Sequence, residues 1–390
     1  MSGRLGKRGR TVDKRHNPPS EEAPLNSDLR SLRDRAPVVI ARSRTAPPGA
    51  FASANTELDF RRHPRPDAYV PGYAIRRTSA MLDDVDKRDT TGNPRVDGLM
   101  SSRIGFIGLG LMGTAMAANL AADGCNVRAY VRRPERINDL QALGVTATTR
   151  RSDLFDSDVI ITMLPDDAAV RNVFFGPFGI SESLRPGVIH LSMSTISTEA
   201  SAAFLLEHER RGQGYVAAPV FGNPDAARAR QLTVILAGNP TSCERCRPVM
   251  DSLGQTFVIG TDPTQANLIK LLGNMMTATA LEVLGEVVTV LRKRGQDPQQ
   301  FVDIMTGTMF DSRVHKNYGS RLVAGSFKPG LTMPLALKDV RLALAEAELA
   351  GAPMPSVGVV RDRLITGIAR GHGGLDWTAL GMVASEEAGL

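Results

Sequence analysis

The sequence predicts a doubly wound α/β domain followed by an all-α domain. From Ile104 onward, short apolar and β-branched segments alternate with helical segments, and after Gly260 the strand signals stop. Several of the short segments are apolar throughout, which is typical of parallel strands that are buried on both faces. Alternating strands and helices indicate βαβ units. We therefore expect residues 100–262 to form the α/β domain and residues 263–390 to form the helical domain.

The expected elements follow from these patterns. The strands are Arg103–Gly108, Asn126–Val131, Val159–Leu164, Val188–Met193, Gly214–Val220, Leu232–Ala237 and Thr256–Ile259. The helices of the second domain are residues 263–294, 297–309, 311–324, 332–350 and 354–370.

Residues 1–99 differ in composition from the rest of the chain. They hold 19 Lys and Arg against 13 Asp and Glu, a difference of +6 that equals the net charge of the whole chain. The remaining residues hold 28 of each sign, so they give no indication of nucleic-acid binding. The segment has no sustained helical or strand period, and we expect a disordered basic leader. The alternative is a functional basic tail that touches anionic partners. We favour an unfolded extension, which an over-extended reading frame with its true start at Met100 would explain.

Cysteine usage and hydropathy bear on location. Three cysteines, Cys125, Cys243 and Cys246, are too few for a disulfide framework and favour a reducing compartment, so we expect a cytoplasmic protein. The last two form a lone CxxC without a second pair at zinc spacing, and we expect no metal site. No stretch reaches about 18 uninterrupted apolar residues, because two glutamates break the longest candidate, Met275 to Leu291, so no membrane span is expected.

A glycine pattern, Gly108-x-Gly110-x-x-Gly113, lies between the first strand and a helical segment. In this context the first glycine allows a tight turn and the second lets the backbone approach a pyrophosphate. The third allows the helix to pack closely on the strand, and the helix N-terminus offers N–H groups to phosphates. The pattern predicts a dinucleotide-binding Rossmann domain. The intervening residues that we also assign to the cofactor site are Leu109, Leu111 and Met112.

The end of the second strand indicates which dinucleotide is bound. An NAD-binding domain usually has an acidic residue here to bind the ribose 2′-hydroxyl, but this chain has Arg132 and Arg133 and no acid before Glu135. Guanidinium groups suit a 2′-phosphate, so we expect NADP, with NAD possible. The alternative is a solvated pair of surface arginines.

The segment Met163-Leu164-Pro165 closes the third strand of the expected list. Ligands of open α/β sheets bind in the crevice beyond the carboxyl ends of strands, so we assign these three residues to the cofactor site. A plain strand terminator is the alternative.

A polar stripe marks the start of the helical domain. Asn267, Lys270 and Asn274 fall at i, i+3 and i+7, and the neighbours of the lysine are large aliphatic residues. Poor solvation disfavours the charged form of a lysine and lowers its pKa, which suits a general acid/base near neutral pH. The residues alone leave open that Lys270 snorkels at a helix edge.

Six motifs occur in order between about Ile104 and Arg370. They are Gly-Phe-Ile-Gly-Leu-Gly-Leu-Met-Gly, Met-Leu-Pro-Asp-Asp, Ser192-Met-Ser-Thr195, Ala218-Pro219-Val220, Lys270-x-x-x-Asn274 and Lys338-Asp339. Together they resemble the β-hydroxyacid dehydrogenase family, which includes the 3-hydroxyisobutyrate dehydrogenases. The cofactor domain of that family is similar to that of 6-phosphogluconate dehydrogenase.

The resemblance implies hydride transfer between NADP(H) and a small molecule, either a hydroxy acid or a semialdehyde or keto acid. It implies Lys270 as the proton donor and acceptor, and Asn274 as a residue that helps to hold the substrate. Ser194 and Thr195 would line the substrate and nicotinamide pocket, and Lys338 would approach the cofactor from the helical domain. A homodimer joined through a long helix is also implied.

The substrate loop departs from the family pattern. Phe221-Gly222-Asn223 stands where the family usually has Ser-Gly-Gly, which suggests a substrate that is larger, more apolar, or not a simple three-carbon hydroxy acid. An imine reductase on the same fold is one alternative, against which Lys270 counts. A non-catalytic NADP-binding interaction protein is another, against which the intact Lys270 and Asn274 count.

Overall fold

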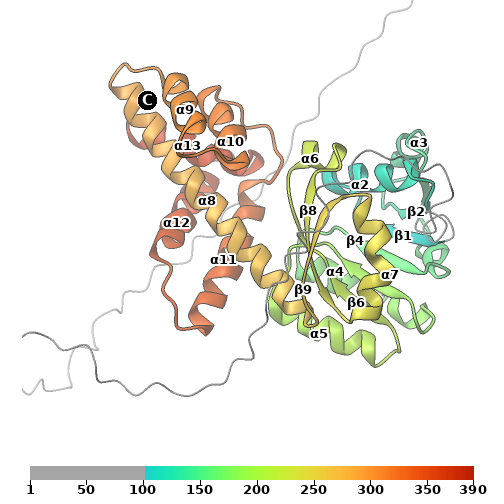
Figure 1. Cartoon of the computed structure of the whole chain (residues 1–390). Helices are drawn as coiled ribbons and strands as arrows, with labels where there is room; N and C mark the ends of the chain where they lie inside the picture. Colours follow the sequence, from blue (N-terminus) through green and yellow to red (C-terminus); the bar gives the residue numbers. More distant parts are fainter. Residues whose placement is uncertain (1–101) are drawn as a thin grey trace, which may run out of the picture. The chain divides into compact units, whose positions relative to one another are not determined.

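The computed structural model describes residues 102–390, so the leader expected for residues 1–99 lies outside the described residues. The described residues belong to one compact unit. Its α/β part is coloured from cyan to yellow in Figure 1, and its helical part runs from orange to red. This order confirms the fold class that the sequence predicts.

One nine-stranded sheet, within the described residues, carries the α/β part. The strand order is β3-β2-β1-β4-β5-β6-β8-β7, and β9 pairs with β8. All pairs from β3 to β6 are parallel, whereas β8 is antiparallel to β6 and β7. The strands are β1 Arg103–Ile107, β2 Asn126–Tyr130, β3 Thr146–Thr148, β4 Val159–Thr162, β5 Ile189–Ser192, β6 Gly214–Ala217, β7 Val220–Phe221, β8 Leu232–Gly238 and β9 Gly254–Gly260.

The strand order creates the crevice in which a ligand can bind. The chain passes from β1 outward to β2 and β3 on one side, and β4 returns to pair with β1 on the other. Connections therefore leave β1 and β4 in opposite directions, which makes their carboxyl ends the switch point of the sheet. Every residue of β4 is buried, as the apolar run Val159 to Ile161 predicts.

Between residues 103 and 260, six α-helices accompany these strands. They are α2 Leu111–Ala122, α3 Arg136–Gln141, α4 Asp167–Phe175, α5 Thr198–Glu209, α6 Pro224–Arg228 and α7 Pro240–Asp251, with short 3₁₀ turns at Arg151–Leu154 and Ser181–Ser183. Side-chain caps fix several of their starts: Asp166 accepts a hydrogen bond from the Ala169 amide, and Ser197 accepts one from the Ala200 amide.

The helical part is organised around α8, Pro263–Lys293, which in Figure 1 runs from the sheet edge at β9 into the helical part. Asp262 caps α8 through the Thr264 amide, and Pro263 occupies the first turn. Its buried residues, among them Leu271 and Leu281, form a core with α11 and α12. The other elements are α9 Pro298–Gly307, α10 Arg313–Val323, α11 Met333–Leu349, α12 Pro355–Ala369, α13 Leu380–Glu387 and the 3₁₀ turns His372–Gly374 and Trp377–Ala379.

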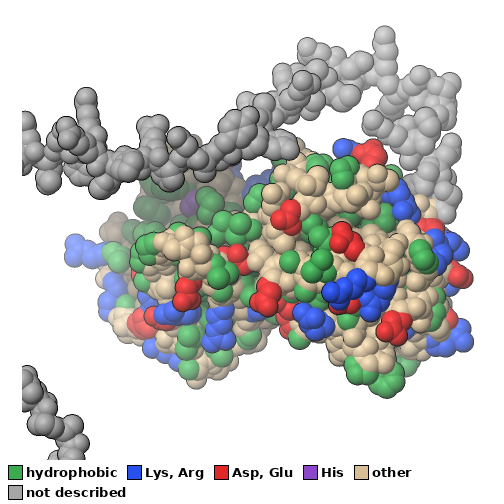
Figure 2. All heavy atoms as spheres, turned by 90° about the horizontal axis from the view of Figure 1, so that it is seen from below, with side chains coloured by type: hydrophobic (Ala, Val, Ile, Leu, Met, Phe, Trp, Pro, Cys, Tyr) green, Lys and Arg blue, Asp and Glu red, His purple; other side chains and the backbone are tan. Residues whose placement is uncertain are grey.

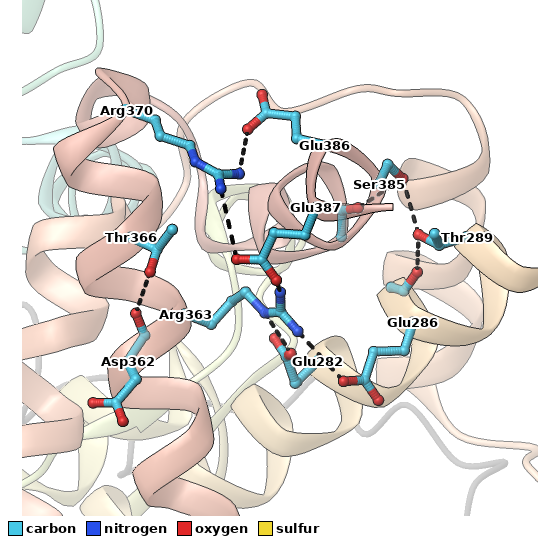
Figure 3. A network of polar contacts seen from close by, with 12 residues as sticks. Glu282, Glu286, Thr289, Asp362, Arg363, Thr366, Arg370, Ser385, Glu386 and Glu387 are labelled. Atoms are coloured by element: carbon cyan, nitrogen blue, oxygen red, sulfur yellow. Dashed lines mark hydrogen bonds and ion pairs between the residues drawn. The ribbon is translucent and has the colours of Figure 1, made fainter. Parts of the chain in front are cut away.

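An ion-pair network joins α12 to α8 and α13 (Figure 3). Arg363 of α12 is 2.7 Å from Glu282 and 3.4 Å from Glu286, both of α8, and it also pairs with Glu387 of α13. Arg370, the residue that follows α12, pairs with Glu387 as well. Burial raises the pKa of Glu282, and the Arg363 guanidinium opposes that rise. The network supplies a cation to a carboxylate that is only 4% exposed.

Within the described residues, α8 is the one helix long and apolar enough to cross a membrane by length and composition. The core helix of a soluble protein meets the same criterion. In this fold, the face of α8 that carries Leu271, Met275 and Leu281 packs in the core of the helical part, and Glu282 is paired with Arg363. The packing therefore accounts for the apolar residues on the buried face of α8.

Most expected elements end within two residues of the observed ones, but three features differ. The single strand expected over Gly214–Val220 is two strands, because Pro219 has no N–H to donate to a ladder. Strand β3 was not predicted, since its three residues are too few to show a period. The helix α13 was also not predicted.

Candidate active site

The glycine loop follows β1 and faces a pocket of about 520 Å³. Gly108 has φ +107°, and a Cβ there would lie 2.7 Å from the carbonyl carbon of Met163 and closer to its oxygen. A Cβ on Gly110 would meet nothing within 4 Å, so this position opens into free space. A Cβ on Gly113 would collide with the Gly108 carbonyl and would lie 3.1 Å from Phe106. The three glycines thus take the turn, approach and packing positions that the pattern predicts.

Four arginines also line this pocket. Arg132 and Arg133 follow β2 as expected, and Arg136 and Arg151 join them from α3 and the turn after β3. The Arg151 guanidinium lies 5.3 Å from the centre of the Tyr130 ring and donates a 2.7 Å hydrogen bond to the Phe178 carbonyl. Sequence reasoning missed Arg136 and Arg151, because no local spacing links them to the glycine motif.

The segment after β4 forms a wall of the same pocket. Met163, Leu164 and Pro165 all line it, as do Leu109 and Gly110. The remaining residues of the loop that we had assigned to the cofactor site, Leu111, Met112 and Gly113, belong to the first turn of α2 and are not in the lining.

Ser194 is fully buried, and its hydroxyl is engaged within the protein. The hydroxyl accepts a 2.8 Å hydrogen bond from the Leu164 amide and donates one of 3.3 Å to the Thr162 carbonyl. In this position Ser194 fixes the segment that follows β4. Thr195 is partly buried, and its carbonyl accepts a hydrogen bond from the Lys338 ammonium of α11.

A chain of polar contacts runs from Lys270 of α8 to α11. The Lys270 Nζ donates to Asn274 Oδ1 at 2.8 Å, and Asn274 Nδ2 donates to Asp339 Oδ2 at 2.7 Å. The second carboxylate oxygen of Asp339 lies 2.9 Å from the Lys338 ammonium, which in turn reaches the carbonyl of Thr195. The chain therefore connects the predicted catalytic lysine to the α/β part.

Burial is the main influence on the pKa of the Lys270 ammonium. Lys270 is 8% exposed, and desolvation lowers its pKa to about 8, against the opposing pull of the Asp339 carboxylate. The positive charge of Lys338 also contributes to this lowering of the pKa, in the same direction as burial. A lysine with this pKa holds both protonation states near neutral pH, which a group that gives and takes a proton requires.

Phe221, the last residue of β7, begins the segment that the sequence predicts to bind substrate, and it lies against this lysine. The Lys270 Nζ is 4.5 Å from the centre of the Phe221 ring, which is cation–π distance. Gly222 has φ +140°, and a Cβ there would lie 2.6 Å from Leu232. Asn223 caps α6 by accepting a 2.8 Å hydrogen bond from the Ala226 amide, so its side chain is engaged in the loop itself.

Comparisons with known proteins agree with this geometry. Residues 103–260 match the family model for the NAD-binding domain of 6-phosphogluconate dehydrogenase. Residues 264–383 match the model for the NAD-binding domain of NADP-dependent 3-hydroxyisobutyrate dehydrogenase.

The relatives of this chain include named oxidoreductases and dehydrogenases. The chain is 38% identical over 281 residues to the uncharacterized oxidoreductase YfjR of Bacillus subtilis, covering 71% of this chain and 98% of that protein. It is 30% identical over 279 residues to 2-hydroxy-3-oxopropionate reductase of Escherichia coli, covering 71% and 95%. A solved 3-hydroxyisobutyrate dehydrogenase of Mycobacterium tuberculosis with L-serine is 26% identical, with a TM-score of 0.63 and coverage of 72% and 98%.

The chain belongs to the β-hydroxyacid dehydrogenase family. It is an NAD(P)-dependent dehydrogenase, as the sequence resemblance implies. The glycine loop and the crevice at the ends of β1 and β4 are the parts of the fold that suit a dinucleotide.

Proposed function

We propose that this chain is an NADP-dependent dehydrogenase or reductase in which Lys270 is the general acid/base. The observation that carries the proposal is the buried Lys270 ammonium, hydrogen-bonded to Asn274 and with its pKa lowered to about 8. Its substrates are small hydroxy acids and the corresponding semialdehydes or keto acids. The name of the Escherichia coli relative, 2-hydroxy-3-oxopropionate reductase, supports this class.

The chemistry divides between the cofactor and the chain. When bound, NADP(H) supplies or accepts the hydride at the substrate carbon. In reduction, the Lys270 ammonium donates a proton to the substrate oxygen as negative charge develops there, and the lysine becomes a neutral amine. In oxidation, the neutral amine takes the hydroxyl proton. Asn274 holds Lys270 in place for both directions through its Oδ1.

The four arginines favour NADP over NAD. Arg132, Arg133, Arg136 and Arg151 line the cofactor pocket, and Arg136 is 3.6 Å from one acidic partner, Asp139. A ribose 2′-phosphate would meet guanidinium groups there, whereas the 2′-hydroxyl of NAD would find no carboxylate at the end of β2. The Lys338 ammonium, which donates a hydrogen bond to the Thr195 carbonyl, would approach the nicotinamide from the helical part.

We also propose a homodimer that covers the outer face of α8. Apolar side chains on this face are exposed, including Met276 at 79%, Val283 at 51% and Val290 at 61%. From Ile269 to Val290 the exposed stripe extends about 30 Å along the helix, which matches another helix better than a small ligand. Light scattering should give twice the monomer mass, and Met276→Glu should give the monomer.

Nucleic acid and membranes are not among the proposed partners. On the face shown in Figure 2, acidic and basic side chains lie interspersed and do not gather by sign. The three cysteines are free and buried, which supports a reducing compartment such as the cytoplasm.

The test is turnover by the wild-type protein. NADPH oxidation should be measured with a panel of semialdehydes, keto acids and cyclic imines, and repeated with NADH. The proposal expects reduction of an aldehyde or keto acid with NADPH favoured. Turnover of imines alone would replace it by the imine reductase alternative, and tight NADPH binding without any turnover would favour a non-catalytic protein.

A further inference from the structure

A groove of about 1050 Å³ runs along the outer face of α8. Its walls come from α8, from α9 and α10, and from the start of α12, and they are almost entirely apolar. Phe221 is the one residue of the α/β part in this lining. Lys270 and Asn274 do not line the groove, so the groove and the catalytic lysine lie on different faces of α8.

Phe221 lies between these two faces. The centre of its ring is 4.5 Å from the Lys270 Nζ, and Phe221 also lines the groove. The ring is in contact with α8 at Gly273, which follows Lys270 by three positions and is therefore its neighbour on the helix surface.

The Phe221 ring packs against α8 at Gly273. A Cβ at this position would lie 2.6 Å from Cε1 of Phe221 and closer still to Cζ. Any side chain on residue 273 would therefore displace the ring. The absence of a Cβ allows Phe221 to lie against the α8 backbone and to fill the space between Lys270 and the groove.

We propose that Phe221 is a specificity-determining residue that bounds the catalytic pocket on the side of the groove and limits the length of the substrate. This inference rests on the proposed function. A substrate whose oxygen meets the Lys270 ammonium cannot extend toward Gly273, because the phenyl ring occupies that space. The preferred substrates are then short-chain, whereas the sequence alone suggested a larger or more apolar substrate.

The chemistry of the ring fits this role. The face of an aromatic ring attracts a cation, so Phe221 tolerates the charged form of Lys270 without competing for its hydrogen bonds. The ring offers no donor or acceptor to a carboxylate on this side. A substrate carboxylate would therefore have to lie on another side of Lys270, away from the groove.

The test is a chain-length series. Straight-chain ω-semialdehydes of increasing length are reduced with NADPH by the wild type, by Phe221→Ala and by Phe221→Leu. The wild type should prefer the short members. In Phe221→Ala, kcat/KM for the longer members should rise relative to the shortest by about tenfold or more for each methylene that the freed space admits. Phe221→Leu should give an intermediate shift.

Phe310→Ala is the matched control. Phe310 also lines the groove, from the segment between α9 and α10, and its ring packs on His315 of α10. Its removal should leave the chain-length preference unchanged. Binding of NADPH, followed by cofactor fluorescence, shows that each variant is folded. If Phe221→Ala does not fold, the chain-length profile of Phe221→Leu tests the role of Phe221.

The outcomes separate the two proposals. If the wild type reduces short semialdehydes but both Phe221 variants keep its chain-length profile, the specificity role of Phe221 is refuted and the proposed function stands. An equal shift in the chain-length preference of Phe310→Ala also refutes the specificity role of Phe221. If the wild type reduces no member of the series and no other aldehyde or keto acid, both proposals are overturned.

Discussion

Replacing Asp339 by Asn tests how the fold sets the protonation of Lys270. The substitution keeps the shape of the side chain and its position beside Asn274, but it removes a negative charge. That charge raises the pKa of Lys270 against the larger effect of burial. Asp339→Asn should therefore lower the pKa of Lys270 further.

The contacts give the size of the effect. Hydrogen bonds of 2.8 Å and 2.7 Å, separated by the amide of Asn274, connect the ammonium to the carboxylate. The two charges are then roughly 7 Å apart, which at an effective dielectric constant of about 20 corresponds to about 2 kcal/mol. A free energy of that size is about one and a half pKa units. The pKa of Lys270 should fall from about 8 to roughly 6.5.

The assay is kcat against pH in both directions. Reduction needs the protonated lysine, so its rate should fall above a pH near 8 in the wild type and above roughly 6.5 in Asp339→Asn. Oxidation needs the neutral amine and should gain activity at lower pH in the variant. Lys338→Met is a control with the opposite expected effect. The Lys338 charge lowers the pKa of Lys270, so its loss should raise the pH above which the reduction rate falls. If this pH is unchanged or higher in Asp339→Asn, the reasoning is refuted.

Three further predictions concern the cofactor and stability. Arg132→Ala should raise KM for NADPH by about 10- to 100-fold, because a charge-assisted contact contributes about 1.5–3 kcal/mol. KM for NADH should stay nearly unchanged, and an equal rise of KM for both cofactors would contradict a 2′-phosphate contact. Burial lowers the pKa of His208 to about 4 from its ordinary 6.5, so the unfolded state binds more protons between these values. Stability should be full above about pH 6.5 and fall by about 2–3 kcal/mol by about pH 4.5, and urea midpoints of the wild type should show this loss more strongly than those of His208→Gln. Arg363→Met leaves Glu282 buried without its cation and should lower the free energy of unfolding by about 3–5 kcal/mol in thermal denaturation. The double variant with Glu282→Met should recover much of this loss, and no recovery would count against the pairing.

The sequence predicts those parts of the fold that local patterns specify. Strand β4 is recognisable because it is buried on both faces and three of its four residues, Val159 to Ile161, are β-branched and apolar. The glycine loop is recognisable because the conformation at Gly108 and the packing at Gly113 exclude a side chain. The break at Pro219 was missed because a continuous apolar run conceals the loss of one backbone donor.

The candidate site divides in the same way. Lys270 and Asn274 follow from helical spacing on one element. Their link to Asp339 joins residues 65 positions apart in sequence, and Arg151 reaches the cofactor pocket through the fold alone. No local pattern predicts such contacts. The position of the Phe221 ring likewise depends on Gly273, which belongs to the other part of the chain.

The most direct test of the central claim compares Lys270→Ala with the wild type in two measurements on the same preparations, NADPH binding and single-turnover reduction of the best aldehyde or keto acid. If Lys270 is the proton donor, the variant should bind NADPH nearly as the wild type does and should lose turnover by about 100-fold or more. Retained turnover would contradict the assigned role of Lys270, and so would a loss of NADPH binding that accounts for the loss of turnover.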